Sequence, residues 1–228
     1  MAPVKSGAAR RCTPGRCSFS RPAAFLFGLL AGVIVLAAVP PSRHLVLRSL
    51  GRLLIVADDF TDADIAVMTT DEGPVGALEV ADLFHQRLVQ RVGVLIPRGT
   101  LAVGELARRG VHISDNADVL TQLGVPAASI ARIAAGEGGT NEGTGALAAW
   151  CADNHIRRLV VVTSSDHSRR VRRTLLRSFG RNRPIVFIHS SRFSQFRPDD
   201  WWRSRTTLRT GIMELEKLAF DYVRHPLG

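Results

Sequence analysis

Short apolar segments alternate with amphipathic segments along most of the chain after residue 50. The apolar segments are typical of strands buried on both faces, and the amphipathic ones are typical of helices. Strands that alternate with helices at this spacing predict an α/β fold with a mostly parallel sheet and right-handed crossovers. The expected strands are Leu53–Val56, Ile65–Met68, Val92–Ile96, Ile130–Ala134, Leu159–Thr163 and Pro184–Ile188.

Helices are expected between these strands and at the C-terminus. Asp115 is a typical N-capping residue, and Gly136–Gly145 is rich enough in glycine to predict a loop. The last helix is expected to pack its apolar stripe on the sheet, and a role in binding a partner is the alternative. The expected helices are Ala77–Gln90, Asp115–Leu123, Ala146–Asn154, Ser168–Phe179 and Thr207–Val223.

One segment near the N-terminus has the character of a membrane anchor. Ala23–Val39 contains seventeen residues without a charge, which as a helix would cover about 25 Å of the bilayer. Residues 1–22 carry five basic side chains and no acid, which predicts a cytoplasmic N-terminus and an extracytoplasmic remainder. A cleaved signal peptide and a buried helix are the competing interpretations.

The chain therefore divides into a basic tail (1–22), a transmembrane anchor (23–39), a connector that can be helical (40–52) and an α/β domain (53–228). The formal net charge is +10, and the tail carries half of it. Three cysteines without metal-type spacing argue against a disulfide framework and against a cysteine metal site. The extracytoplasmic topology and the lack of a nucleic-acid motif disfavour nucleic acid as a partner.

Polar side chains that can do chemistry follow the strand Leu159–Thr163 directly. In open α/β sheets, ligands bind outside the carboxyl ends of the strands, so this cluster predicts a site. His167 can act as a general acid or base, and the arginines that follow can bind anions. Thr163 and Ser164 can hold an anionic oxygen together with the first amides of the next helix, or simply cap that helix.

Four segments in the correct order resemble the YdcF/SanA/ElyC-like family, a group of bacterial envelope proteins. Leu54–Asp64 resembles the family's entry segment, and Leu123–Ile130 is similar to its GVPxxxI element. Gly139–Glu142 partly matches an NTxEN-like loop, and Val162–Arg170 matches VTSxxHxxR. The resemblance implies a Rossmann-like three-layer sandwich, often membrane-anchored, that acts in peptidoglycan or lipid-carrier glycan biogenesis.

The same segments also depart from the family pattern. Thr69–Gly73 stands where the family usually has a Gly-Gly loop, and Pro97–Thr100 stands where Ser-Gly-Gly is usual. The NTxEN-like loop has Gly139 in place of its leading Asn and ends in Gly143. These changes leave open whether the family's ligand, or any catalysis, is shared.

The resemblance and the residues together give a candidate site. Thr140 and Glu142 are carried over from the NTxEN-like loop, and Glu142 could supply a catalytic carboxylate opposite His167. Thr140, Thr163, Ser164 and Arg170 are the expected ligand-binding residues. No phosphate-binding P-loop or dinucleotide fingerprint is present, so no cofactor is assigned. The four aspartates within Asp58–Asp64 lack the pattern of a calcium loop, so no metal is expected.

The expected function is binding or processing of a phosphate-bearing envelope intermediate, and whether the protein is an enzyme stays open. A non-catalytic scaffold or sensor is one alternative, and a domain that binds a nucleotide or S-adenosylmethionine is another. The arginine-rich helix Ser168–Phe179 could attract anionic lipid, or could present an ordinary solvated face.

Overall fold

The computed structural model describes residues 40–97, 105–106, 108–111, 114–136, 139–180 and 183–226, together with positions 28, 32 and 99. The predicted anchor Ala23–Val39 lies outside the described residues except for Gly28 and Gly32. Among the described helices, none combines the length and the apolar character that crossing a bilayer requires. The α/β fold belongs to the compact unit Val46–Gly228.

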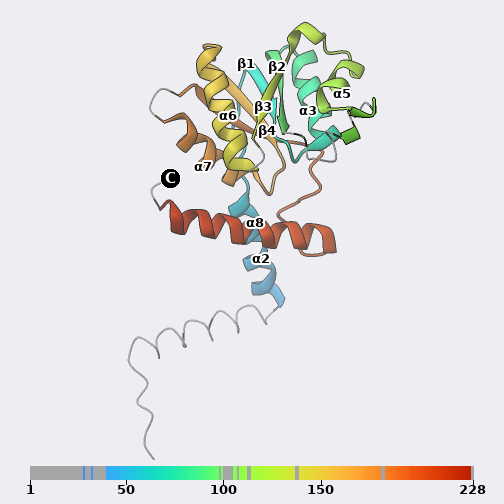
Figure 1. Ribbon diagram of the computed structural model, residues 1–228. Helices are drawn as coiled ribbons and strands as arrows, with labels where there is room; N and C mark the ends of the chain where they lie inside the picture. The colour runs from blue at the N-terminus through green and yellow to red at the C-terminus, as the bar shows by residue number, and fades with distance from the viewer. Residues whose placement is uncertain are drawn as a thin grey trace, which may run out of the picture. The chain divides into compact units, whose positions relative to one another are not determined.

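The described strands form one five-stranded, all-parallel sheet in the order β3-β2-β1-β4-β5 (Figure 1). This arrangement confirms the α/β prediction and is consistent with a Rossmann-like fold. The order reverses between β1 and β4, which is the position where such sheets keep their ligand sites. The strands are β1 (Ala63–Met68), β2 (Val89–Pro97), β3 (Ile130–Ala135), β4 (Arg158–Thr163) and β5 (Ile185–Ser190).

Helices cover both faces of this sheet because its central strands are apolar on both sides. Neighbouring residues of a strand point to opposite faces, so β1 sends Ala66 and Met68 to one core and Ile65 and Val67 to the other. The first core lies under α3 (Gly73–His85) and α5 (Asn116–Gln122), and the second lies under α6 (Thr140–Asp153) and α7 (Ser168–Phe179).

Most element predictions are confirmed, and three are corrected. Leu53–Val56 is not a strand, because helix α2 (Pro40–Leu54) includes its first two residues, with Leu54 in a cluster with Trp201, and the other two lie outside any helix or strand. More than half of the predicted loop Gly136–Gly145 is helical, since α6 (Thr140–Asp153) begins directly after Gly139. Helix α3 ends at His85 rather than at Gln90, because a turn with positive φ at Arg87 leads into β2.

Trp201 joins helix α2 to the C-terminal helix α8 (Arg205–Arg224). Its indole ring fits against two glycines, Gly51 on α2 and Gly211 on α8, and its Nε1–H donates to the carbonyl of Leu47 at 2.8 Å. A Cβ atom at either glycine would come within 3 Å of the indole ring. The end of α2 is therefore held against α8 by close packing around one aromatic side chain.

Gly211→Ala is expected to lower the free energy of unfolding by about 1–2 kcal/mol, because overpacking forces side chains out of their preferred positions. The new Cβ would lie 2.6 Å from Cε3 of Trp201, and the ring is held from its other side. Denaturant unfolding measures the change. Gly145→Ala is the matched control, since nothing lies within 4 Å of its Cβ position, and it should be neutral or stabilising. Equal effects at the two sites would contradict this packing.

Candidate active site

A pocket of about 620 Å³ lies at the carboxyl ends of β1 and β4, where the strand order reverses. The loop after β1 and the loop after β4 form two of its walls, the start of α6 adds a third, and α8 closes it. The sheet topology alone predicts a ligand site at this position. The polar lining of the pocket includes Glu72, Thr140, Ser164, Asp166, His167, Arg170, Glu214 and Lys217.

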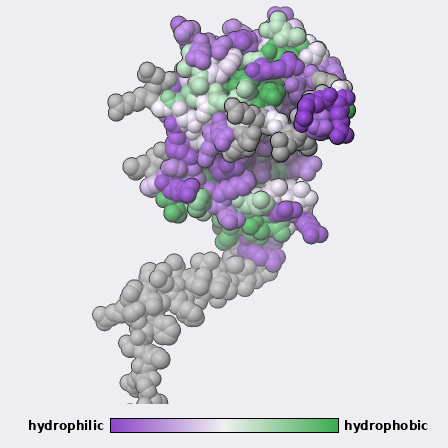
Figure 2. Space-filling view, viewed as in Figure 1, coloured by the Kyte–Doolittle hydropathy of each residue, from purple (hydrophilic) through white to green (hydrophobic). Residues whose placement is uncertain are grey.

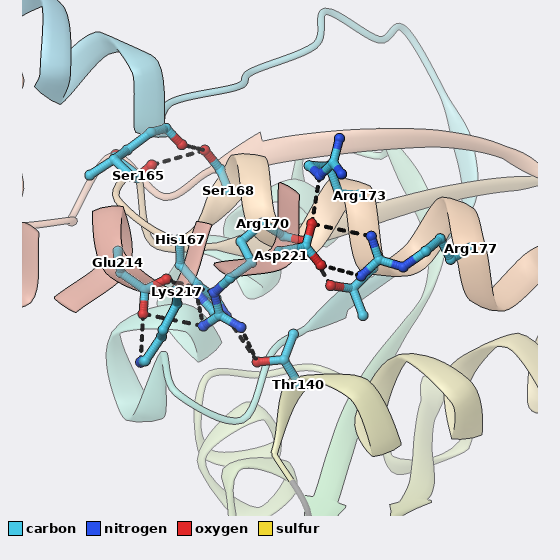
Figure 3. Close-up of polar contacts among 12 residues, drawn as sticks. Thr140, Ser165, His167, Ser168, Arg170, Arg173, Arg177, Glu214, Lys217 and Asp221 are labelled. Atoms are coloured by element: carbon cyan, nitrogen blue, oxygen red, sulfur yellow. Dashed lines mark hydrogen bonds and ion pairs between the residues drawn. The ribbon is translucent and has the colours of Figure 1, made fainter. Parts of the chain in front are cut away.

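His167 and Glu214 form a buried pair between α7 and α8 (Figure 3). The Nδ1 atom of His167 lies 2.9 Å from Oε2 of Glu214. Nη2 of Arg170 also lies 2.8 Å from this Nδ1, but the guanidinium donates to the Glu214 carboxylate as well. A carboxylate can only accept hydrogen bonds, so its contact with the ring requires a proton on Nδ1. We therefore assign Nδ1–H as donating to the Glu214 carboxylate, which leaves Nε2 as the ring atom available to a ligand.

Arg170 and Lys217 complete the surroundings of the Glu214 carboxylate. Arg170 donates to both carboxylate oxygens, from Nε at 2.8 Å and from Nη2 at 3.2 Å, and Lys217 donates at 2.8 Å. Burial raises the pKa of Glu214, but the hydrogen bonds from His167 and Arg170 stabilise its ionised form by more than burial costs. The pKa of Glu214 therefore lies well below its usual range. Glu214 is thus a fixed anion that orients the imidazole of His167.

Thr140 approaches His167 from the N-terminus of α6. Gly139 precedes it with φ of 75°, a conformation that suits glycine, and turns the chain into the helix. The Oγ1 atom of Thr140 accepts a hydrogen bond from Arg170 at 3.2 Å and lies 3.4 Å from Nε2 of His167. The second distance is long for a hydrogen bond, so a water or a substrate hydroxyl can take the place of Thr140 at Nε2.

Two further acids line the pocket, Glu72 and Asp166, and the pKa of each is raised. Burial, reinforced by the charges of Asp71 and Asp166, raises the pKa of Glu72 to about 7, although a hydrogen bond from Ser164 acts against this. Burial likewise raises the pKa of Asp166. An acid with a pKa near neutrality can donate a proton during a reaction and recover it from water, which makes Glu72 a candidate general acid.

Helices α3, α6 and α7 all begin at the rim of the pocket. Their N-cap residues are Glu72, Gly139 and His167, and none of the three makes a side-chain capping bond to its own helix. The first amides of a helix carry partial positive charge and need acceptors. Together with Arg170 and Lys217, these helix ends favour a ligand with an anionic group such as a phosphate.

The structure brings four of the six predicted site residues to the pocket: Thr140, Ser164, His167 and Arg170. Thr163 is fully buried at the end of β4, and its hydroxyl has no hydrogen-bond partner among the described residues. Glu142 is exposed on the first turn of α6, with its carboxylate against Gly136, and does not line the pocket. Its catalytic role stays a prediction, and the carboxylate that contacts His167 is Glu214.

Sequence reasoning missed Glu214, Lys217 and Glu72, and it gave no site role to Asp166, which belongs to the polar cluster after Leu159–Thr163. Glu72 and Asp166 carried a usable signal, because each lies within a few residues of the carboxyl end of a strand. No sequence signal pointed to Glu214, since the apolar stripe of its helix is typical of a helix that only packs against the domain core. The stripe is corrected too, because three of its expected members, Ile212, Ala219 and Tyr222, are exposed. The buried face runs through Gly211, Glu214 and Leu218 instead, whereas the sequence pattern predicts a stripe of Leu208, Ile212, Leu215, Leu218, Ala219 and Tyr222.

The arginine side chains of α7 form ion pairs and hydrogen bonds within the protein and do not make up an unpaired, solvent-facing surface. Arg172 pairs with Asp58 at 2.7 Å, and Arg173 and Arg177 both pair with Asp221 of α8 (Figure 3). Arg169 donates to the carbonyl of Leu53. Because these groups already have partners, we do not assign α7 a role in lipid binding. Within the described part of the chain, no group of three or more His, Cys, Asp or Glu side chains is placed to hold a metal ion.

Comparison with protein-family models and with curated proteins gives no match. Among solved structures, the chain matches the reductase domain of an aureusimine biosynthetic cluster at 15% identity, with a TM-score of 0.27. The match covers 53% of this chain and 39% of that structure, so it spans well under half of the neighbour's length. A superposition this poor carries no argument about function.

Proposed function

We propose that this protein is a membrane-anchored, extracytoplasmic α/β enzyme of the YdcF/SanA/ElyC type that processes a phosphate-bearing intermediate of the cell envelope. The observation that carries the proposal is the buried contact between His167 and Glu214, which leaves Nε2 of the imidazole facing a pocket at the reversal point of the sheet. A histidine held in one tautomer by a carboxylate is a recurring arrangement for general-base catalysis.

The reaction we propose is hydrolysis or transfer at the phosphate linkage. Nε2 of His167 takes a proton from a water or an acceptor hydroxyl as that oxygen attacks, and Glu214 stabilises the imidazolium that forms. The bond to the leaving oxygen breaks with its electron pair, and protonated Glu72 supplies the proton that this oxygen needs. The proton on His167 then returns to solvent, and Glu72 regains its own.

Binding of the phosphate is assigned to the cations and helix ends of the same pocket. The Nη1 atom of Arg170 faces the start of α6 through Thr140, and Lys217 reaches the pocket from α8. A phosphate at this place would accept hydrogen bonds from the guanidinium and from the first amides of α6 and α7. Its negative charge would also keep Glu72 protonated, which favours the role of Glu72 as an acid.

A thermal-shift screen of the full-length protein in detergent tests this binding site. The probes are inorganic phosphate, a nucleotide sugar, a muropeptide, a polyprenyl pyrophosphate and S-adenosylmethionine. A phosphate-bearing probe should raise the unfolding midpoint by a few degrees at saturating concentration. His167→Asn and Arg170→Gln should remove that shift, whereas His155→Asn, which changes an exposed histidine, should keep it. A shift that survives in both pocket variants would contradict the site.

A non-catalytic binding or scaffold module is the second candidate, and one observation favours it. Glu214 is neutralised by three donor side chains, so the network can also be understood as a structural tie between α7 and α8. This candidate predicts that a probe raises the unfolding midpoint while no product forms. A nucleotide or S-adenosylmethionine ligand would appear in the same screen as the probe that gives the shift.

A further inference from the structure

We infer that the outward face of helix α8 docks on the surface of an anionic lipid bilayer. This outward face consists of the exposed residues at helical spacing on the side of α8 away from the domain core. Its apolar members are Ile212, Met213, Phe220 and Val223, and its basic members are Arg205, Arg209 and Arg224. The inference rests on the proposed anchoring of the chain by Ala23–Val39.

The apolar side chains of the outward face are exposed to an extent that needs a reason. Val223 is 79% exposed, Phe220 58% and Ile212 52%. Ile212, Phe220 and Val223 lie along one side of the helix, with Glu216 between the first two, because positions three or four apart share a helix face. The opposite side packs Leu215 and Leu218 into the cluster around Trp201. Figure 2 shows hydrophobic surface along α8, interrupted by hydrophilic residues.

Basic residues at both ends of the outward face supply charge complementary to anionic lipid. Arg205 and Arg209 stand at its N-terminal end, and Arg224 stands at its C-terminal end with its guanidinium 4.7 Å from the Phe220 ring centre. Among the described residues of this face, Glu216 is the one acid. An apolar stripe flanked by arginines is typical of helices that lie in the plane of a membrane surface.

The place of α8 in the chain favours a bilayer over a protein partner. Trp201 ties α8 to Gly51 and Leu47 of α2, and only residues 40–46 separate Leu47 from the predicted anchor. The helix has 20 residues, which is long enough to lie across roughly 30 Å of membrane surface. It is not apolar enough to cross the membrane, as the described helices in general are not.

Docking of α8 would also fix the orientation of the pocket. Thr206, Thr210 and Lys217 belong to the same helix and line the pocket from the side next to the outward face. A bilayer held against the outward face would therefore bring lipid headgroups close to the pocket mouth.

The test places an environment-sensitive fluorophore on α8 of the full-length protein in vesicles of phosphatidylglycerol and phosphatidylcholine. Cys12 and Cys17 are replaced by serine, while Cys151 can stay because it is buried and burial raises the pKa of its thiol to about 12. Phe220→Cys then carries the label. Ile185→Cys is the matched control, because Ile185 is 60% exposed and starts strand β5 on the sheet edge away from the pocket.

The expected result is at least about twofold stronger quenching by spin-labelled lipid at position 220 than at position 185. Replacing Arg205, Arg209 and Arg224 by glutamine should reduce this quenching toward the value in pure phosphatidylcholine, since each arginine near an anionic surface favours binding by about fivefold. Equal quenching at positions 220 and 185 in protein that floats with the vesicles would overturn the docking and leave the anchor standing. Protein that does not float would overturn both.

Discussion

Glu214→Gln is expected to lower the free energy of unfolding at neutral pH by about 2–3 kcal/mol, because removing one member of a buried ion pair leaves its partners uncompensated. Arg170 loses the carboxylate that it contacts through two hydrogen bonds, and Lys217 loses its hydrogen-bond acceptor. We place the effect below the usual range for a fully buried pair because Lys217 is about half exposed. Denaturant unfolding measures the change.

The pH dependence of this effect has a definite sign. The pKa of Glu214 is lower in the folded protein than in the unfolded chain, so its ionisation stabilises the fold above the unfolded pKa of 4.5. That contribution is lost as pH falls, and the gap between wild type and Glu214→Gln should therefore close in acid. Glu216→Gln, an exposed change two positions along the same helix, should cost little at any pH. A gap that widened in acid would refute the ion network.

Glu72→Gln is expected to act in the opposite direction and to stabilise the protein at pH 8 by up to about 3 kcal/mol, the free energy that corresponds to its raised pKa. Folding raises the pKa of Glu72 from 4.5 to about 7, so between these values the folded state binds more protons than the unfolded chain. The free energy of unfolding therefore falls as pH rises through this window. Glutamine does not titrate, so the free energy of unfolding of the variant does not fall in this pH window.

Unfolding at pH 5 and at pH 8 tests the Glu72 prediction. The advantage of Glu72→Gln should be small at pH 5, where the folded wild type carries a protonated Glu72, and near its full size at pH 8. The same variant should lose turnover at both values, because an amide cannot act as the general acid. A stabilisation of equal size at both pH values would show that the side chain is not titrating in this window.

The fold could be predicted from the sequence because its strands are apolar on both faces. Residues Leu159–Val162 read as one continuous apolar run and are all buried in β4, and the expected bounds of α7 agree with the structure. Leu53–Val56 shows the same kind of run but is not a strand. Leu54 is buried by α8 and Trp201 instead of by the sheet, and no local pattern distinguishes these two environments.

Only the part of the candidate site that lies within one short stretch of sequence could be predicted. His167 is the N-cap of α7 and Arg170 lies in its first turn, so the family resemblance and the strand end pointed to both. Glu214 lies 47 residues beyond His167 and reaches it only because α8 crosses the pocket. The assignment of Glu142 as the partner of His167 had the right chemistry, a carboxylate, but the contact belongs to a helix whose pattern indicated packing.

The decisive measurement is the turnover of His167→Asn, because Nε2 of His167 is the proposed general base. The full-length protein is incubated with the phosphate-bearing probe that shifts its unfolding midpoint, and product is compared for wild type, His167→Asn and His155→Asn. We expect a loss of about a hundredfold or more in His167→Asn with the unfolding midpoint little changed, and no loss in His155→Asn. Undiminished turnover in His167→Asn, or no turnover by the wild type, would contradict it.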